Sequence, residues 1–215
     1  MEMFLFFALM AVIGISALLL NYLYEKKRTE AWANKAQQLG FSFFENNSDL
    51  LREFKFDFFR KGHSREIKNL LRQNNAGVDL SICDFIYETK GSKNNSSHKQ
   101  TVCVISTLAL NLPEFELHPR RFLLDTVFSM ISGSSVDFES DPEFNGKYSV
   151  SANNHDAVKN IFGAEPRNWL TNNFNADFSF EAKDNALLVI CKKRIKPEQV
   201  EPLMRRAFDV MNLFA

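Results

Sequence analysis

The stretch Met3–Leu20, with the sequence MFLFFALMAVIGISALLL, is continuously apolar or small and contains no charged residue. A helix rises about 1.5 Å per residue, so a helix from Met3 to Tyr24 covers roughly 30 Å, the thickness of a bilayer's hydrocarbon core. The residues that follow are typical of a membrane boundary: amphipathic rings at headgroup depth, Tyr22 and Tyr24, and then a basic flank, Lys26, Lys27 and Arg28. Residues 1–28 are therefore predicted to form a membrane anchor with its basic flank.

Two alternatives for this stretch are a cleaved signal peptide and a buried helix of a soluble core. A signal peptide has a basic n-region and a small-x-small cleavage site, whereas this chain begins Met1-Glu2 and places Ile15-Ser16-Ala17 inside the apolar run. We therefore favour a retained single-pass anchor. Because basic residues follow the span and none precedes it, we expect the N-terminus outside the cell membrane and the C-terminal domain in the cytoplasm, at the inner face.

The composition of the chain excludes some classes of function. The formal net charge is zero, from 26 Lys and Arg against 26 Asp and Glu, so the basic stripe that nucleic-acid binding requires is missing. The three cysteines, Cys83, Cys103 and Cys191, lie singly in apolar runs, which indicates buried thiols in a reducing compartment and neither a disulfide framework nor a zinc site. We predict no metal and no cofactor.

Phenylalanine is unusually frequent, with 22 residues in 215. Several alternate with polar residues, as in Phe41-Ser-Phe43 and Phe178-Ser-Phe180, which is the period of a half-buried strand. We interpret them as an aromatic core, and an aromatic groove for an apolar ligand is the alternative.

The pattern of the remaining chain predicts an α+β fold, in which an N-terminal transmembrane helix precedes an antiparallel sheet with helices packed on one face. Residues 29–40 are predicted to extend the anchor as a helical stalk that ends at Gly40, and residues 41–215 to form the soluble domain, with a possible internal boundary near 131–136.

Within this domain, three segments predict an antiparallel meander: Glu66–Gln73, Val78–Lys90 and Lys99–Leu110. Thr101–Leu108 is our candidate for a central strand, Leu112–Leu117 for an edge strand with Pro113 near its start, and Phe122–Met130 for a helix. The later segments predict a strand, two helices, a hairpin and an amphipathic C-terminal helix: Lys147–Ser151, Asp156–Phe162, Pro166–Asn172, Ala176–Lys183 with Ala186–Arg194, and Glu201–Phe214.

Several short motifs, taken in order, resemble a group of uncharacterised bacterial single-pass membrane proteins with one domain of unknown function. They are Leu39–Phe43 (LGFSF), Phe58-Phe59 with Gly62, Asp84 with Tyr87, Gln100–Val102, Leu112–Phe115 and Phe138–Tyr148 (FESDPEFNGKY). The resemblance implies a bacterial setting and carries no catalytic residue or ligand.

Two acidic features are the candidate ligand-binding residues. The run Asp137–Glu143, read as a strand, would place four carboxylates on one face, where they could hold a cation or share a proton: Asp137, Glu139, Asp141 and Glu143. An EF-hand is excluded because Pro142 and Tyr148 occupy its glycine and glutamate positions, so we favour a solvated edge. Asp84 interrupts an apolar strand and would be a functional candidate if it pointed inward, although an outward or strand-end aspartate is the interpretation we favour.

No phosphate-binding loop, HExxH motif or GxSxG elbow occurs, and the four histidines are isolated. We therefore expect a membrane-tethered domain, more readily non-enzymatic than enzymatic, that binds a protein partner or senses a ligand at the inner face of the membrane. The alternatives are a membrane-anchored hydrolase that uses the carboxylates and a lipid-binding module that uses the phenylalanines.

Overall fold

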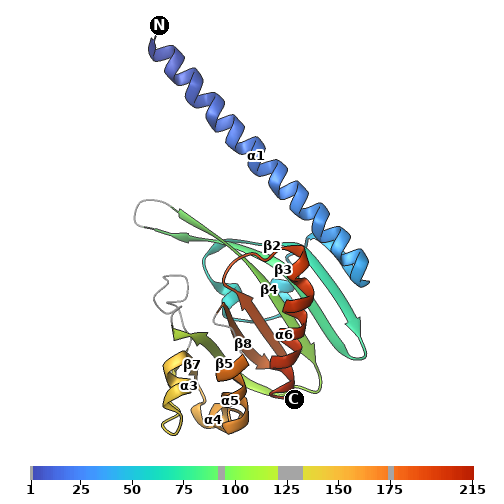
Figure 1. The fold of residues 1–215 in the computed structure, drawn as a ribbon, viewed down its shortest axis with the longest axis vertical. Helices are drawn as coiled ribbons and strands as arrows, with labels where there is room; N and C mark the ends of the chain where they lie inside the picture. Colours follow the sequence, from blue (N-terminus) through green and yellow to red (C-terminus); the bar gives the residue numbers. More distant parts are fainter. Residues whose placement is uncertain (1, 92–94, 121–132, 174–176) are drawn as a thin grey trace.

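The computed structural model describes residues 2–91, 95–120, 133–173 and 177–215, and Figure 1 shows a long N-terminal helix standing away from a domain built on one sheet. In these residues the sheet has nine strands: β1 Ser42–Asn46, β2 His63–Asn75, β3 Val78–Lys90, β4 Asn95–Thr107, β5 Leu112–Pro119, β6 Ser134–Val136, β7 Tyr148–Ala152, β8 Phe178–Asp184 and β9 Ala186–Cys191. The helices are α1 Glu2–Leu39, α2 Leu50–Glu53, η1 Phe58–Arg60, α3 Pro142–Lys147, α4 His155–Ile161, α5 Ala164–Asn173, η4 Pro197–Gln199 and α6 Val200–Asn212. The predicted α+β class, with an antiparallel sheet behind an N-terminal apolar helix, is confirmed.

The order of the strands in the sheet is β1-β2-β3-β4-β9-β8-β5-β7-β6, and every neighbouring pair is antiparallel. The predicted meander is β2-β3-β4, and the predicted hairpin is β8-β9. β4 is an interior strand, as expected from its apolar run, because it pairs with both β3 and β9. The pairing of β9 with β4 joins the C-terminal hairpin to the N-terminal meander, so sequence order does not give strand order.

The prediction of an edge strand at Leu112–Leu117 is wrong. β5 pairs with β8 on one side and with β7 on the other. Pro113 is tolerated because the register of the β5-β8 pair is irregular between Leu112 and Phe115, so the missing N–H of the proline falls where regular pairing is interrupted.

The two faces of the sheet are covered differently. The larger hydrophobic core lies beneath α6, α3–α5 and the C-terminal part of α1, with Phe115, Phe162 and Phe180 among its buried rings. The opposite face carries a smaller core beneath the short α2 and η1 segment, where Phe58 and Phe59 pack on Phe85 of β3. Most phenylalanines of the domain are therefore core residues that contact one another.

Helix α1 is continuous from the apolar stretch to the sheet. The apolar side chains as far as Tyr24 whose burial is described are exposed, and by length and composition α1 is a helix that could cross a membrane. Beyond that point Trp32 and Ala36 are fully buried against the larger core. The helix ends before Gly40, whose φ of +73° is the left-handed conformation expected at a helix C-terminus.

The predicted stalk at residues 29–40 is helical but does not stand free. This part of α1 packs on β1 and β2 because its apolar stripe at Trp32, Ala36 and Leu39 needs a partner surface, and the sheet supplies it. The last turns of α1 are consequently part of the domain.

The segment near the possible internal boundary joins strands of one sheet. Ser134–Val136 forms β6, which pairs with β7 at the sheet edge, so chain on both sides of residues 131–136 contributes to the same sheet. The predicted helices at Asp156–Phe162, Pro166–Asn172 and Glu201–Phe214 are observed as α4, α5 and α6, and Asn154 caps α4 by accepting from the N–H of Ala157. The predicted helix Phe122–Met130 lies outside the described residues.

Candidate functional site

A buried ion pair fastens α1 to the sheet. The guanidinium of Arg28 donates from Nε to Oδ2 of Asp84 and from Nη2 to Oδ1, both at 2.7 Å, in a bidentate arrangement. Arg28 lies one helical turn beyond Tyr24, and Asp84 lies in the middle of β3 on the face that α1 covers. Asp84 is completely buried and Arg28 is only 9% exposed.

Both partners of this pair are held by further hydrogen bonds. Asp84 also accepts from Oγ1 of Thr101 at 2.8 Å and from Nδ2 of Asn69 at 3.1 Å. Arg28 donates its remaining nitrogen, Nη1, to the carbonyl of Ile195 at 2.8 Å, and the N–H of Ile195 donates to Thr101. Desolvated charges are tolerable in such a setting because the lone pairs and protons of both groups are satisfied.

A second, more exposed cluster lies one turn closer to the exposed apolar part of α1. Glu25 accepts from Nζ of Lys99 at 2.9 Å and from both terminal nitrogens of Arg194 at 2.8 and 3.0 Å. Burial by itself would raise the pKa of Glu25, but the hydrogen bonds and charges of Arg194 and Lys99 outweigh it and lower the pKa to about 2. The guanidinium of Arg194 also lies 5.8 Å from the ring centre of Tyr24.

Further along α1, Trp32 lies against Arg28, and Lys35 joins the helix to α6. Arg28 lies over the Trp32 ring at 5.2 Å, and Lys35 donates to Glu201 of α6 at 2.6 Å. We call the set Glu25, Arg28 and Trp32, with Asp84, Lys99, Thr101, Arg194 and Ile195, the helix–sheet junction. It connects α1 to β3, β4 and the segment after β9.

The residues of the predicted anchor flank have two different environments. Tyr22, Tyr24, Lys26 and Lys27 are exposed, as residues at a membrane boundary can be. Arg28 is not, and its assignment as a simple stop charge is wrong because its guanidinium is directed into the domain. The sequence places Arg28 beside two exposed lysines, and only the fold distinguishes it from them.

The interpretation of Asp84 as an outward or strand-end aspartate is also wrong. It is a buried carboxylate with a specific partner, and the signal for this was present in the sequence as a charge within an apolar strand. What the sequence could not give was the partner, 56 residues away. Because protein donors engage both oxygens, Asp84 is a structural anchor and is not positioned to bind a substrate.

The acidic run Asp137–Glu143 does not form a strand with its carboxylates on one face. Asp141 caps α3 by accepting from the N–H of Phe144 at 3.0 Å and also accepts from Nε of Arg167 at 2.9 Å. Asp137 accepts from the side-chain amide of Asn145, Glu143 pairs with Lys147 within α3, and Glu139 is exposed. Pro142 explains why a helix forms here in place of the expected strand, because proline at a first helical position favours a helix start.

Asp84 and this acidic run are not brought together. β3 and β6 are separated by six positions in the sheet, or roughly 30 Å at about 4.8 Å per strand. A shared carboxylate site of the kind that the hydrolase hypothesis needs is therefore not formed by these residues.

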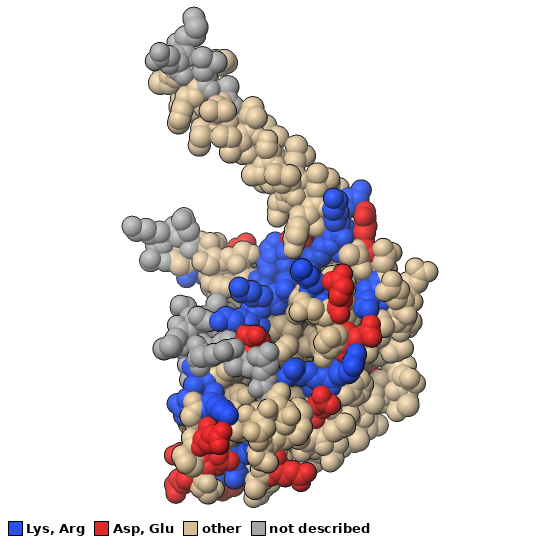
Figure 2. Space-filling model, viewed as in Figure 1, with Lys and Arg blue, Asp and Glu red and all other residues tan. Residues whose placement is uncertain are grey.

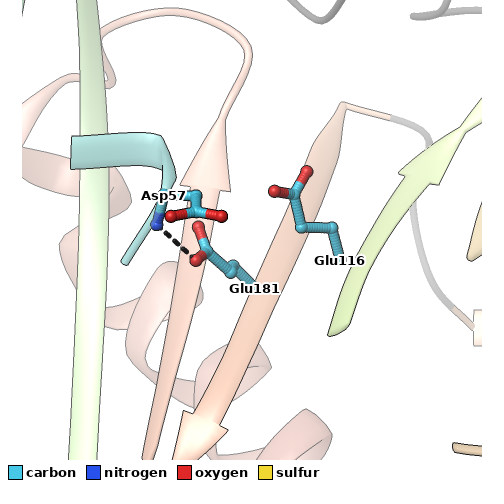
Figure 3. A group of neighbouring side chains, drawn as sticks. All are labelled: Asp57, Glu116 and Glu181. Carbon is cyan, nitrogen blue, oxygen red and sulfur yellow. Dashed lines mark hydrogen bonds between the residues drawn. The ribbon is translucent and has the colours of Figure 1, made fainter. Parts of the chain in front are cut away.

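A different group of carboxylates is close together, and the sequence analysis missed it. Asp57, Glu116 and Glu181 offer oxygens that all lie within 4.8 Å of one another (Figure 3). They lie on the face of the sheet opposite α1, because the strand neighbours Phe115 and Phe180 belong to the larger core that α1 joins. Glu116 and Glu181 come from the neighbouring strands β5 and β8, and Asp57 precedes η1. The alternation of apolar and polar residues along β5 and β8 could have indicated that Glu116 and Glu181 share one face of the sheet. It could not place Asp57 beside them.

The contacts of this cluster are mainly structural. Glu181 accepts from the N–H groups of Asp57 and Phe58 at 2.6 and 2.9 Å, so it caps the start of η1. Glu116 accepts from Nε2 of His118 at 2.8 Å, and the buried ammonium of Lys61 interacts electrostatically with all three carboxylates. A cavity of about 10 Å³ beside the cluster has room for about one water molecule.

These carboxylates are the residues that could hold a cation, since oxygen ligands suit hard divalent ions. The oxygens of Glu181 are already occupied by backbone donors, and Lys61 supplies a positive charge. Burial is the main influence on Glu181 and, with the charge of Glu116, raises its pKa to about 8 against the opposing effect of the two N–H donors. We therefore interpret the cluster as a polar contact that orders η1.

No protein-family model and no curated protein matches the chain. Among solved structures, the crystal structure of the mycobacterial trehalose monomycolate transport factor A, TtfA, is similar, with a TM-score of 0.58 and 15% sequence identity. The match covers 89% of this chain and 96% of that chain. At this identity the similarity establishes a shared fold.

The helix–sheet junction can be tested with a double-mutant cycle on Arg28 and Asp84. We expect Asp84→Leu and Arg28→Met each to lower the free energy of unfolding by about 3–5 kcal/mol, because each leaves a buried charge without its partner. The double variant should cost less than the sum of the two by about 2–3 kcal/mol. Chemical denaturation of the full chain in detergent micelles measures this.

The matched control for this cycle is the exposed pair Arg52 and Asp49, 3.8 Å apart. Substitutions of that pair should be additive within about 0.5 kcal/mol. Strict additivity at Arg28 and Asp84 would show that the two residues are not energetically coupled.

Glu181 should make stability depend on pH. Because its pKa is raised to about 8 in the folded state, the folded protein binds more protons than the unfolded chain between about pH 4.5 and 8. Its contribution to stability is therefore complete below about pH 4.5 and is lost as pH rises through 8, with a slope of at most about 1.4 kcal/mol per pH unit.

The measurement is the unfolding free energy at several pH values for the parent chain and for Glu181→Gln, which should flatten the slope. The exposed residue Glu139 provides the control, since Glu139→Gln should leave the slope unchanged. An unchanged slope in Glu181→Gln would remove Glu181 as its source.

Proposed function

We propose that this protein is a membrane-tethered, non-catalytic domain that binds a membrane protein partner and acts as an accessory component in transport at the membrane. The observation that carries the proposal is the helix–sheet junction, in which one unbroken helix has an exposed apolar part and a buried part fixed to the sheet. A flexible tether would only concentrate the domain near the membrane. A fixed helix also holds the domain in one orientation, which suits a component that must face a neighbouring membrane protein.

The fold similarity supports the transport part of the proposal. TtfA is described as a trehalose monomycolate transport factor, and its fold corresponds to nearly the whole of this chain. We extend from that protein only the general role of a factor associated with the transport of a lipid-linked molecule.

The two alternatives from the sequence have less support in the described residues. A hydrolase built on Asp84 would need a carboxylate that is accessible, and Asp84 is enclosed by four donors from three side chains. A lipid-binding module would use the phenylalanines, but Phe115, Phe162 and Phe180 pack against one another in the core. The larger of the two cavities described, between α2 and the β8-β9 turn, is lined largely by polar and charged residues.

We further propose that the setting is bacterial and that the domain lies on the cytoplasmic side of the inner membrane. The support is the resemblance to bacterial single-pass proteins and the basic residues that follow the span without a counterpart before it. Leu108, at the turn between β4 and β5, is 93% exposed and so offers a site for a test.

A cysteine introduced by Leu108→Cys should react with a membrane-impermeant thiol reagent only after the cells are lysed. The native cysteines are buried, so labelling reports on the introduced residue. Labelling in intact cells would place the domain outside the cytoplasm.

Crosslinking tests the partner. A photoreactive residue placed at Leu108, or at the half-exposed Phe44 of edge strand β1, should capture a specific membrane protein from cells that express the full chain. The matched control retains α1 and replaces residues 41–215 with an unrelated domain carrying the same photoreactive residue. Equal capture by this control would contradict a partner-binding role for the domain.

A further inference from the structure

Basic side chains gather where α1 meets the domain. In Figure 2, Lys and Arg are concentrated on the part of the surface next to the end of the exposed apolar helix. The exposed lysines there come from two segments far apart in sequence, Lys26 and Lys27 on α1 and Lys193 and Lys196 after β9. We call these four residues the juxtamembrane basic surface.

The helix–sheet junction brings the two segments together. Arg194 lies between the second pair of lysines and binds Glu25, the residue immediately before Lys26. Ile195 accepts a hydrogen bond from Arg28, the residue immediately after Lys27. Lys193 and Lys196 are thus held within two residues of direct contacts to the first turn of α1 beyond the apolar part.

Lys26 and Lys27 begin within one turn of the end of the exposed apolar part of α1, so this surface would lie near the lipid headgroups of a membrane that α1 enters. The exposed apolar part of α1 runs to Tyr24, and Arg28 follows four residues later, or about 6 Å along the helix axis. The Debye length at physiological ionic strength is about 8 Å, so charges at this distance from the membrane boundary are within range of headgroup phosphates.

Neighbouring acidic residues do not cancel the positive charge. Glu25 is shared by Arg194 and Lys99, and Asp84 is matched by Arg28. Glu30 and Glu198 are exposed nearby, against the four lysines of the surface. The exposed charge beside the helix is therefore predominantly positive even though the whole chain is neutral.

We propose that the juxtamembrane basic surface binds the headgroups of anionic phospholipids in the membrane that α1 enters, as a second attachment that fixes the tilt of the sheet against the bilayer. Lysines near an anionic leaflet are attracted without a shaped pocket, and each contributes roughly a fivefold preference. This inference does not depend on the identity, or the existence, of a protein partner.

The test uses the full chain in nanodiscs, with a spin label on Glu198→Cys beside the basic surface and a small fraction of lipid carrying a nickel chelate on its headgroup. Relaxation of the spin label by nickel reports how close the label lies to the lipid surface. We expect stronger relaxation in nanodiscs that contain phosphatidylglycerol than in nanodiscs of phosphatidylcholine alone, and we expect high salt to remove the difference.

The decisive variant is Lys193→Glu with Lys196→Glu, which lies far from the anchor in sequence and so leaves the charges that orient α1 unchanged. We expect it to abolish the increase in nickel relaxation with anionic lipid. Loss of the two lysines alone corresponds to a change of roughly 30-fold in the ratio of docked to undocked protein, and the two added carboxylates enlarge that change. Lys55→Glu with Lys159→Glu alters two exposed lysines outside the basic surface and should retain the increase.

If the charge reversal disturbs folding, as judged by circular dichroism, we use Lys193→Gln with Lys196→Gln. This variant should still reduce the increase in nickel relaxation that anionic lipid causes. Equal relaxation in the two kinds of nanodisc, or an unchanged increase in the lysine variants, would overturn the proposal. Loss of the increase on addition of inorganic phosphate at constant ionic strength would indicate a discrete phosphate site and would also overturn attachment to the membrane surface.

Discussion

The bidentate pair of Arg28 and Asp84 fixes the position of helix α1 against the sheet. An arginine at this position of α1 could have stayed exposed, as its neighbours Lys26 and Lys27 are. Instead it enters the domain, where Asn69, Thr101 and Ile195 satisfy the pair. A buried charge without its partner is strongly unfavourable, so helix and sheet are required to stay in register. The direction of α1 is thereby coupled to β3 and, through pairing, to the rest of the sheet.

Hydrophobic packing and the outer charge cluster reinforce this constraint at different depths. Trp32 and Ala36 bury the C-terminal end of α1 against the larger core. Glu25, Lys99 and Arg194 form the charge cluster nearer the exposed apolar part of the helix. The same contacts that fix the helix also bring the segment after β9 beside Lys26 and Lys27. Mechanical attachment and the arrangement of surface charge therefore have one structural origin.

The polar cluster on the opposite face has a separate role. Asp57, Glu116 and Glu181 lie close enough to resemble a metal site, but two of the hydrogen bonds to Glu181 come from the backbone at the start of η1. Those bonds order the turn that places Phe58 and Phe59 on Phe85. Proximity of carboxylates alone does not define a ligand site, and here the donors that surround them account for their burial.

The sequence by itself determined the apolar helix, the α+β class, the β2-β3-β4 meander, the β8-β9 hairpin and the helices α4 to α6, because periodicity and capping are local properties. Only the tertiary structure decided that β5 is interior, that Asp141 caps a helix, and that Asp84 is buried. It also decided the pairing of Arg28 with Asp84 and the gathering of Lys193 with Lys26. The physical reason is that partners of charges and neighbours of strands are chosen by global packing, and contacts across 56 to 169 residues leave no periodic pattern in the chain.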